Sequence, residues 1–286
     1  MKKFDLRTPI IYVLTFIILI LLIVMKKMDD EKKEKMLEEK MVVVEKKRKE
    51  KEELDVTFPQ KPEPGIKGII GLVIDDFGYR NDEISDGFLE LDARLTYAVI
   101  PGHRHSTSFG QKAVESGYEV IVHMPMENTG KTYGEEEFVL MTAMDSETIQ
   151  RRINNAIKDI PNAIGMNNHQ GSKATSDSKT MTVLASVLKD RGKYFIDSRT
   201  SPLTIGEKTM ISFGVPTARR NIFLDNNNDL DKIEEQMNKL ANSAKKNGVA
   251  VGLGHARKNT LSVIEKVVPN LLDKGFVFQF ASQIVK

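Results

Sequence analysis

The sequence predicts an α/β domain with a parallel sheet, beginning near residue 68. Short apolar runs alternate along the chain with segments of helical periodicity, an order that favours successive strand–helix units. The runs are apolar throughout, which is typical of parallel strands covered on both faces. The predicted strands are 69–74, 95–100, 118–122, 162–166, 193–196, 249–253 and 276–280. This pattern alone is equally compatible with an open sheet and a closed barrel.

The N-terminal residues predict a membrane anchor. Residues 9–25 carry no charge over 17 positions, at the short end of what crosses a bilayer. No small-residue cleavage site follows, so we expect an uncleaved signal anchor preceded by a cytoplasmic segment, 1–8. The flanking lysines by themselves do not favour this orientation, because several also follow the span.

A charged stalk and a linker are expected next. Residues 26–55 hold 11 basic and 11 acidic side chains, and such a composition does not fold as a globule. Glutamate–lysine pairs three and four apart favour a solvated helix over 26–57, with a coiled coil as the alternative. Three prolines and a glycine then mark residues 58–67 as a linker before the domain, 68–286.

Four helices are predicted within the domain. They are 146–159, 177–191, 229–247 and 259–273. The second begins at an Asp/Ser cap and ends at Gly192, and the third ends at Gly248, both common helix boundaries.

Composition excludes several classes of function. The whole chain has a net charge of +2, and residues 66–286 carry 27 basic and 27 acidic side chains, so no basic excess indicates a nucleic-acid partner. The chain has no cysteine, which excludes disulfides, thiolate-bound zinc and thiol catalysis. It also has no tryptophan, the residue that most often stacks on sugars.

Five predicted strands are each followed by an acid or an imidazole. The ends of parallel strands share one face of a β/α domain, where active sites are built. Carboxylates and imidazoles without thiols suit Zn²⁺ or a similar ion, which lowers the pKa of bound water and supports hydrolysis of an amide or ester. These residues are Asp75 and Asp76, His123, Asn167 with Asn168 and His169, Asp197, and His255.

Six segments resemble the divergent polysaccharide deacetylase family, a branch of the NodB-like carbohydrate esterases. They keep the family's order across residues 68–286. They are LVIDDFG (72–78), HMPME (123–127), GMNNHQGSKAT (165–175), YFIDSRT (194–200), ARRNIFLD (218–225) and GLGHARKNT (252–260). The resemblance implies a distorted seven-stranded barrel that hydrolyses acetyl groups of an envelope glycan with a divalent metal, Zn²⁺ above others.

The resemblance also implies roles for single residues. Asp75 corresponds to the base and Asp76 to a metal ligand, with His123 as a second ligand. The family's main branch has another histidine four residues later, where this chain has Glu127, so His169 is the expected third ligand and Glu127 the weaker candidate.

The remaining roles complete the expected site. His255 corresponds to the acid that protonates the leaving group, and Asp197 to a further catalytic carboxylate. Asn167, Asn168, Arg220 and Glu127 are the candidates for binding substrate, although the two asparagines also suit turns. Asp225 either joins the site or begins the asparagine-rich turn that follows it. His103 and His105 are expected to face solvent.

Two functions remain open at this point. One is a membrane-anchored deacetylase acting on an acetylated polysaccharide or a peptidoglycan-type glycan, with its domain outside the cytoplasm. The family's association with glycans and the absence of cysteine favour this location. The other is a catalytically silent glycan-binding or envelope-assembly protein on the same fold, which the missing tryptophan and Glu127 favour. A phosphoesterase is disfavoured because the domain lacks a basic phosphate site.

Overall fold

The computed structural model describes Lys26 and residues 65–132 and 134–286. The chain divides between Phe58 and Pro59, and the described α/β domain belongs to the unit Pro59–Lys286. The expected segment 1–8 and anchor 9–25 lie outside the described residues, as do the stalk 26–57, apart from Lys26, and most of the linker 58–67. Within the described part, no helix is both long and apolar enough to cross a bilayer.

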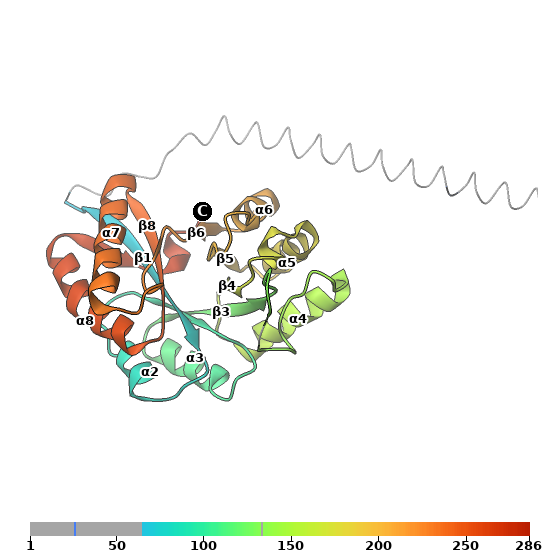
Figure 1. The fold of residues 1–286 in the computed structure, drawn as a ribbon, viewed down its shortest axis with the longest axis horizontal. Helices are drawn as coiled ribbons and strands as arrows, with labels where there is room; N and C mark the ends of the chain where they lie inside the picture. The colour runs from blue at the N-terminus through green and yellow to red at the C-terminus, as the bar shows by residue number, and fades with distance from the viewer. Residues whose placement is uncertain (1–25, 27–64, 133) are drawn as a thin grey trace, which may run out of the picture. The chain divides into compact units, whose positions relative to one another are not determined.

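The described residues form one parallel sheet of nine strands (Figure 1). The strands are β1 Gly68–Phe77, β2 Thr96–Val99, β3 Glu119–Met126, β4 Gly165–Gln170, β5 Tyr194–Asp197, β6 Thr217–Arg219, β7 Ile222–Phe223, β8 Val249–His255 and β9 Phe276–Gln279. Their order is β6-β5-β4-β3-β2-β1-β8-β7. One edge of β1 pairs with β8, while β9 and β2 pair with successive halves of the other edge.

The sheet curls without closing. The terminal strands β6 and β7 do not pair with each other in the described structure, although only Arg220 and Asn221 separate them. Three Cα–Cα steps span at most about 11 Å, so the two ends of the sheet lie close together. All seven predicted strands are present. The expected count of seven is wrong, because the sheet has nine strands and the two others, β6 and β7, are too short to show a sequence pattern.

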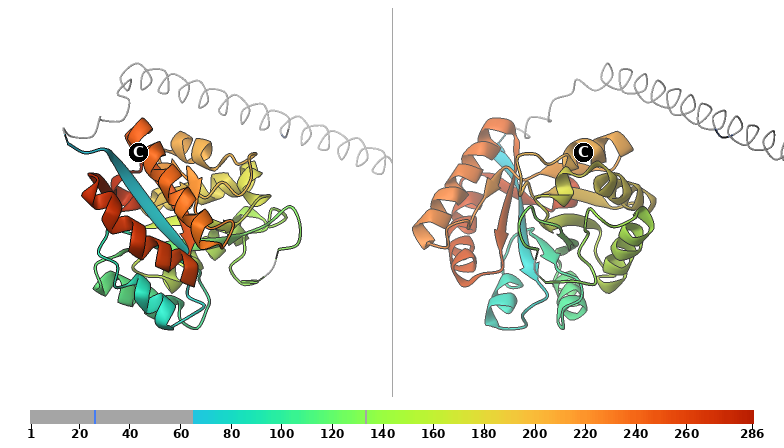
Figure 2. Two further views of the ribbon diagram at one scale, coloured as in Figure 1. Left: turned by 60° about the vertical axis from the view of Figure 1, so that its left-hand side comes forward. Right: turned by 45° about the vertical axis from the view of Figure 1, so that its right-hand side comes forward.

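Helices cover the outside of this curled sheet (Figure 2). The four predicted helices are α4 Ser146–Asp159, α5 Ser178–Asp190, α7 Leu230–Asn247 and α8 Lys258–Asp273. Asp145, Asp177 and Asp229 cap the first three by accepting backbone N–H groups. Sequence patterns missed the shorter elements, α2 Glu83–Phe88, α3 Ser106–Glu115, α6 Gly206–Phe213 and the 3₁₀ turns η1 Ala174–Ser176 and η2 Ala281–Gln283.

Alternate residues of each strand face two different cores. The larger cluster lies between the sheet and the helices, and the smaller one fills the inside of the curl. The inner cluster consists of Val73, Ala98, Ile121, Tyr194, Ile196, Val251, Ala281 and Ile284. Two inward glycines leave little room for a Cβ atom. A Cβ on Gly71 would lie 2.2 Å from Ile284 Cδ1, and one on Gly165 would lie 2.5 Å from the Tyr194 ring.

Candidate metal centre

The carboxyl ends of the strands place polar groups directly above the inner core. Strand side chains alternate between the two faces, so Asp75 follows Val73 inward and His123 follows Ile121. On β4, Asn167 and His169 continue the inward face of Gly165. The structure therefore brings residues from β1, β3, β4 and β8 to one end of the curled sheet.

Asp75 and Asp76 are neighbours, yet both reach the same site. Regular alternation would turn Asp76 outward. Instead Asp76 has a left-handed φ of 69°, and the pairing of β1 with β2 shifts register between Ile74 and Phe77. A non-glycine residue in this conformation costs about 1–3 kcal/mol and commonly marks a functional site. The irregularity turns a second carboxylate into the site.

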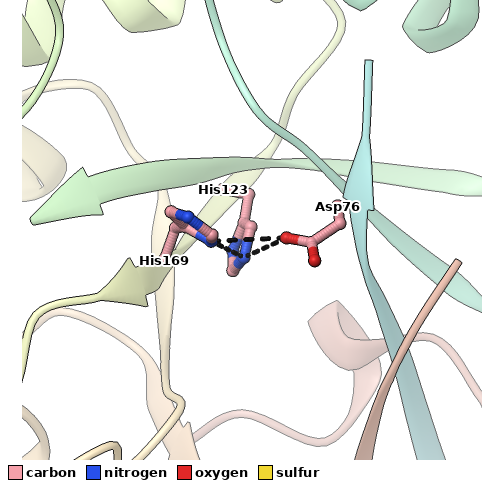
Figure 3. A group of neighbouring side chains, drawn as sticks. All are labelled: Asp76, His123 and His169. Carbon is pink, nitrogen blue, oxygen red and sulfur yellow. Dashed lines mark hydrogen bonds and ion pairs between the residues drawn. The ribbon is translucent and has the colours of Figure 1, made fainter. Parts of the chain in front are cut away.

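Three side chains from different strands converge on one point (Figure 3). Asp76 Oδ1 lies 3.4 Å from His123 Nε2 and 3.3 Å from His169 Nδ1, and the two ring nitrogens are 3.1 Å apart. Tetrahedral zinc with bonds of about 2.0–2.2 Å separates its ligands by about 3.4 Å. Asp76 Oδ1 is buried without a hydrogen-bond partner. These residues therefore fit a divalent transition metal.

The charged groups around this point shift one another's pKa values. Burial alone would lower the pKa of His123, but the carboxylates of Asp75 and Asp76 outweigh it and raise the pKa to about 9. Burial alone would raise the pKa of Asp76, but the facing imidazoles of His123 and His169 hold it well below its ordinary value. The protonated His123 imidazole offsets part of this negative charge, and a bound cation would do the same.

The pKa of Asp75 is shifted in the opposite direction from that of Asp76. It is 2% exposed, and burial raises its pKa although His123 and His255 oppose that shift. It accepts a hydrogen bond of 2.8 Å from Asn167 Nδ2. Adjacent carboxylates whose environments push their pKa values apart commonly divide into a proton acceptor and an ionised ligand.

His255 is held by a buried carboxylate. Asp225 Oδ1 lies 2.9 Å from His255 Nδ1, while Oδ2 accepts the His255 backbone N–H and the Thr260 hydroxyl. His255 pairs in register with Asp75, and its Nε2 lies 3.8 Å from Asp76 Oδ2. Sequence reasoning left Asp225 between a site role and a turn, because β7 just before it is too short to predict.

Asp197 does not join this group. Tyr194 and Ile196 face the inner core, so alternation directs Asp197 outward. Its carboxylate accepts hydrogen bonds from Arg199 N, Thr204 Oγ1 and Glu207 N at the start of α6. It makes no hydrogen bond or ion pair with the converging residues of the described site. The catalytic role expected from sequence is therefore at odds with its orientation.

Glu127 is not a metal ligand in this arrangement. Its Oε2 accepts hydrogen bonds of 2.7 Å from the backbone N–H and the hydroxyl of Thr142, and Lys173 Nζ lies 2.7 Å from Oε1. These contacts tie the β3–α4 loop to the segment after β4. His169, the other candidate, is the residue that faces Asp76 and His123.

Asn168 and Arg220 also have structural partners. Asn168 points away from the site and accepts a 2.9 Å hydrogen bond from Ser198 N, which links β4 to the end of β5. The Arg220 guanidinium donates to the Ser198 and Arg199 carbonyls and lies over the Phe223 ring. Both residues organise the end of the sheet, and neither contact requires a substrate.

A second polar cluster joins three loops beside the site. Tyr79 donates its hydroxyl to Glu135 Oε1 at 2.6 Å, and His103 Nε2 lies 2.9 Å from the same oxygen. The Tyr79 and His103 rings are 4.1 Å apart between centroids. His103, expected in solvent, is held here. Tyr79, which the sequence patterns do not single out, is 43% exposed as a residue while Glu135 holds its hydroxyl.

Comparisons with known proteins agree with the fold and its motifs. A family model described as divergent polysaccharide deacetylase matches residues 72–285. YibQ of Escherichia coli K12, named as an uncharacterized protein, is 34% identical over 208 residues, 73% of this chain and 65% of its own length. An uncharacterized protein of Haemophilus influenzae Rd is 33% identical over 202 residues, 71% of each chain.

A solved structure shows the same fold. The crystal structure of the uncharacterized protein ATU2773 from Agrobacterium tumefaciens C58 superimposes with a TM-score of 0.72, covering 79% of this chain and 92% of that one. At 19% sequence identity, the likeness concerns the fold alone.

Proposed function

Because the chain belongs to the divergent polysaccharide deacetylase family, we propose that it is a metal-dependent hydrolase that removes acetyl groups from a cell-envelope glycan. The observation that carries the proposal is the convergence of Asp76, His123 and His169 on one point. Asp75 lies next to this point, and so does His255 with its partner Asp225.

The proposed ligands are Asp76 Oδ1, His123 Nε2 and His169 Nδ1. A bound Zn²⁺ would lower the pKa of a coordinated water and polarise an acyl carbonyl. His169 would then carry its proton on Nε2, which lies 3.1 Å from the Gln170 amide nitrogen. Rotating that amide by 180° would present its oxygen to this proton, at the expense of the 2.6 Å hydrogen bond that Gln170 Oε1 accepts from Asn128 Nδ2.

The flanking residues supply the proton transfers. Asp75 is buried with a raised pKa, so it is suited to accept a proton from the attacking water. His255 Nδ1 faces the Asp225 carboxylate, which orients the ring and stabilises its protonated form. Protonated His255 then donates from Nε2 to the departing amine or alcohol. The atoms that face the proposed ligands are Asp75 Oδ2 and His255 Nε2.

An exposed aromatic ring close to the proposed centre is compatible with a sugar ligand. Tyr79 lies three residues after Asp76 and offers an exposed ring in a chain that has no tryptophan. The domain as a whole is neutral, which suits an uncharged acetylated glycan better than a polyanion. Location outside the cytoplasm, attached through residues 9–25, remains part of the proposal and follows from sequence alone.

The direct test combines metal content with acetate release. Full-length protein would be purified in detergent, analysed by elemental mass spectrometry, and incubated with N-acetylated and O-acetylated glycans, peptidoglycan fragments included. We expect near-stoichiometric zinc or a similar ion in the parent protein. His123→Ala and His169→Ala should lose it, and Asp75→Asn should keep the metal while losing turnover.

His105→Ala is the matched control, because His105 lies outside the cluster and makes no side-chain capping bond on α3. It should retain both metal and turnover. A parent protein that binds none of zinc, manganese, cobalt or nickel would contradict the proposal. Glycan binding with metal but no acetate release from any substrate would instead favour the catalytically silent glycan-binding or assembly role.

A further inference from the structure

Asn167 lies between His123 and Asp75 in the proposed centre. Its side chain is completely buried on β4, and its register partner on β3 is His123. The amide oxygen Oδ1 lies 2.7 Å from His123 Nδ1, and the amide nitrogen Nδ2 donates to Asp75 Oδ1 at 2.8 Å. One amide therefore contacts both a metal-ligand candidate and the candidate base.

The chemistry of the three groups determines which atoms carry protons. Asp75 is ionised in its proposed role as base, and an ionised carboxylate only accepts hydrogen bonds, so the amide presents its NH₂ group to Asp75. The amide oxygen, which also only accepts, then faces His123 Nδ1. That ring nitrogen must be the donor, and a neutral His123 is left with an unprotonated Nε2 directed at Asp76 Oδ1.

We propose that Asn167 is a positioning residue that holds His123 in the Nδ1-protonated tautomer, so that the Nε2 lone pair is available to a metal. This inference rests on the proposed metal centre and assigns Asn167 a role different from the substrate contact expected from sequence. By the same pair of hydrogen bonds, Asn167 fixes the orientation of Asp75 relative to the His123 ring.

Other groups in the described structure do not duplicate this arrangement. His123 is 2% exposed, and the other neighbours of its ring face Nε2: Asp75 Oδ2, Asp76 Oδ1 and His169 Nδ1. Because Asn167 and His123 are both buried, solvent does not readily replace a lost amide acceptor. Removing an outer partner of a metal-binding histidine typically weakens metal affinity by about 10–100-fold.

Two substitutions separate the tautomer effect from a packing effect. Asn167→Leu keeps a similar volume but removes the acceptor for His123 Nδ1. Asn167→Asp keeps an acceptor there, but replaces the donor to Asp75 by a second carboxylate oxygen and adds a negative charge. Asn168→Leu is the control, because the adjacent asparagine contacts Ser198 N and Gln170 O instead of His123.

The measurements are made on the full-length chain, with and without added Zn²⁺. Long-range ¹H–¹⁵N correlation spectra of histidine-labelled protein, recorded where His123 is neutral, report its tautomer. His123→Ala identifies the signals. Competition with a chelator gives the zinc dissociation constant, and circular dichroism confirms that each variant is folded.

We expect the Nδ1-protonated tautomer in the parent and in Asn167→Asp. Asn167→Leu should lose this preference and bind zinc about 10–100-fold more weakly, whereas Asn168→Leu should change neither property. An Nε2-protonated His123 in the parent would overturn the inference, even if Asn167→Leu failed to fold. So would a folded Asn167→Leu with parental zinc affinity.

Failure of this inference can be told apart from failure of the proposed function. A parent that shows the expected tautomer and zinc response but releases no acetate contradicts hydrolysis and leaves the role of Asn167 intact. A parent that releases acetate but has the other tautomer contradicts the role of Asn167 alone. If the parent binds no zinc, the tautomer spectra still decide whether Asn167 controls His123.

Discussion

Asp225 Oδ1 and His255 Nδ1 lie 2.9 Å apart, and the other carboxylate oxygen of Asp225 accepts the His255 backbone N–H. Asp225 is completely buried, and the charged groups facing it include His255, whose imidazole holds the pKa of Asp225 below its ordinary value despite burial. In the reverse direction, burial alone would lower the pKa of His255, but Asp225 and Asp76 raise it. This pairing links a loop after β7 to the end of β8.

Asp225→Asn should slow acetate release without removing the metal. The amide can still contact His255 but does not carry the charge that stabilises the protonated ring, so a loss of about 10²–10⁴-fold in kcat is expected. The zinc dissociation constant should stay close to the parental value, because Asp225 is not among the three proposed ligands. Steady-state kinetics and zinc titration on the same preparation check both statements, and an unchanged kcat would contradict the role assigned to Asp225.

Zinc should stabilise the parent protein but not Asp76→Asn. A ligand that binds only the folded state at 100 times its dissociation constant adds about 2.7 kcal/mol to the free energy of unfolding. Asp76 Oδ1 is one of the three converging atoms, so its replacement should abolish most of this gain. Denaturant unfolding with zinc and with excess chelator measures it. Equal stabilisation of parent and variant would place the zinc elsewhere.

Glu127→Gln should lower stability at neutral pH and have little effect in acid. Burial alone would raise the pKa of Glu127, but Lys173 and Thr142 outweigh it and lower the pKa below 4.5. A depressed folded-state pKa adds stability that is complete above the unfolded pKa and disappears as the pH falls through the folded value. Because hydrogen bonds to a charged group contribute about 1.5–3 kcal/mol, a loss of about that size is expected at pH 7.

Urea unfolding of parent and Glu127→Gln between pH 3 and pH 7 would show this convergence. Asp86→Asn is the control. The lysine partner of Asp86 is half-exposed, and exposed ion pairs contribute little to stability. A difference for Glu127→Gln that persists unchanged in acid would show that size or polarity, rather than charge, makes Glu127 important.

Gly165→Ala should destabilise the domain through the inner core. The added Cβ would lie 2.5 Å from the Tyr194 ring, and inserting a methyl group into a packed interior typically costs about 1–3 kcal/mol. Gly130→Ala is the matched control, because its Cβ would meet no atom within 4 Å. Thermal and urea unfolding compare the two. Equal stabilities would mean that the inside of the curled sheet accommodates the methyl group by a small shift.

Local patterns in the sequence predicted much of the architecture. Apolar runs located the seven longer strands, and helical periodicity located the four longer helices, because both signals repeat within a single element. Motif order indicated the family, and the residue types indicated a carboxylate–imidazole centre. The anchor over 9–25 and its orientation remain predictions from the sequence, since those residues are not described.

Other features depend on contacts that no local pattern contains. Asp225 and the short strands β6 and β7 lie in segments too brief for a periodic signal. Asp197 and Asn168 look like site residues in the sequence, but strand alternation turns them toward the outside of the curl. Glu127 looks like a replacement ligand, but Lys173 and Thr142 hold it elsewhere.

The sequence by itself determined which chemical groups follow the strands and that the chain would fold as a parallel α/β domain. Only the tertiary structure decided which of those groups meet. Asp76 enters the site through a left-handed backbone conformation and a register shift, and His123 and His169 meet it because β1, β3 and β4 lie on one curled sheet. The physical reason is that residue type and periodicity are local properties, whereas convergence depends on sheet curvature and on which face each side chain takes.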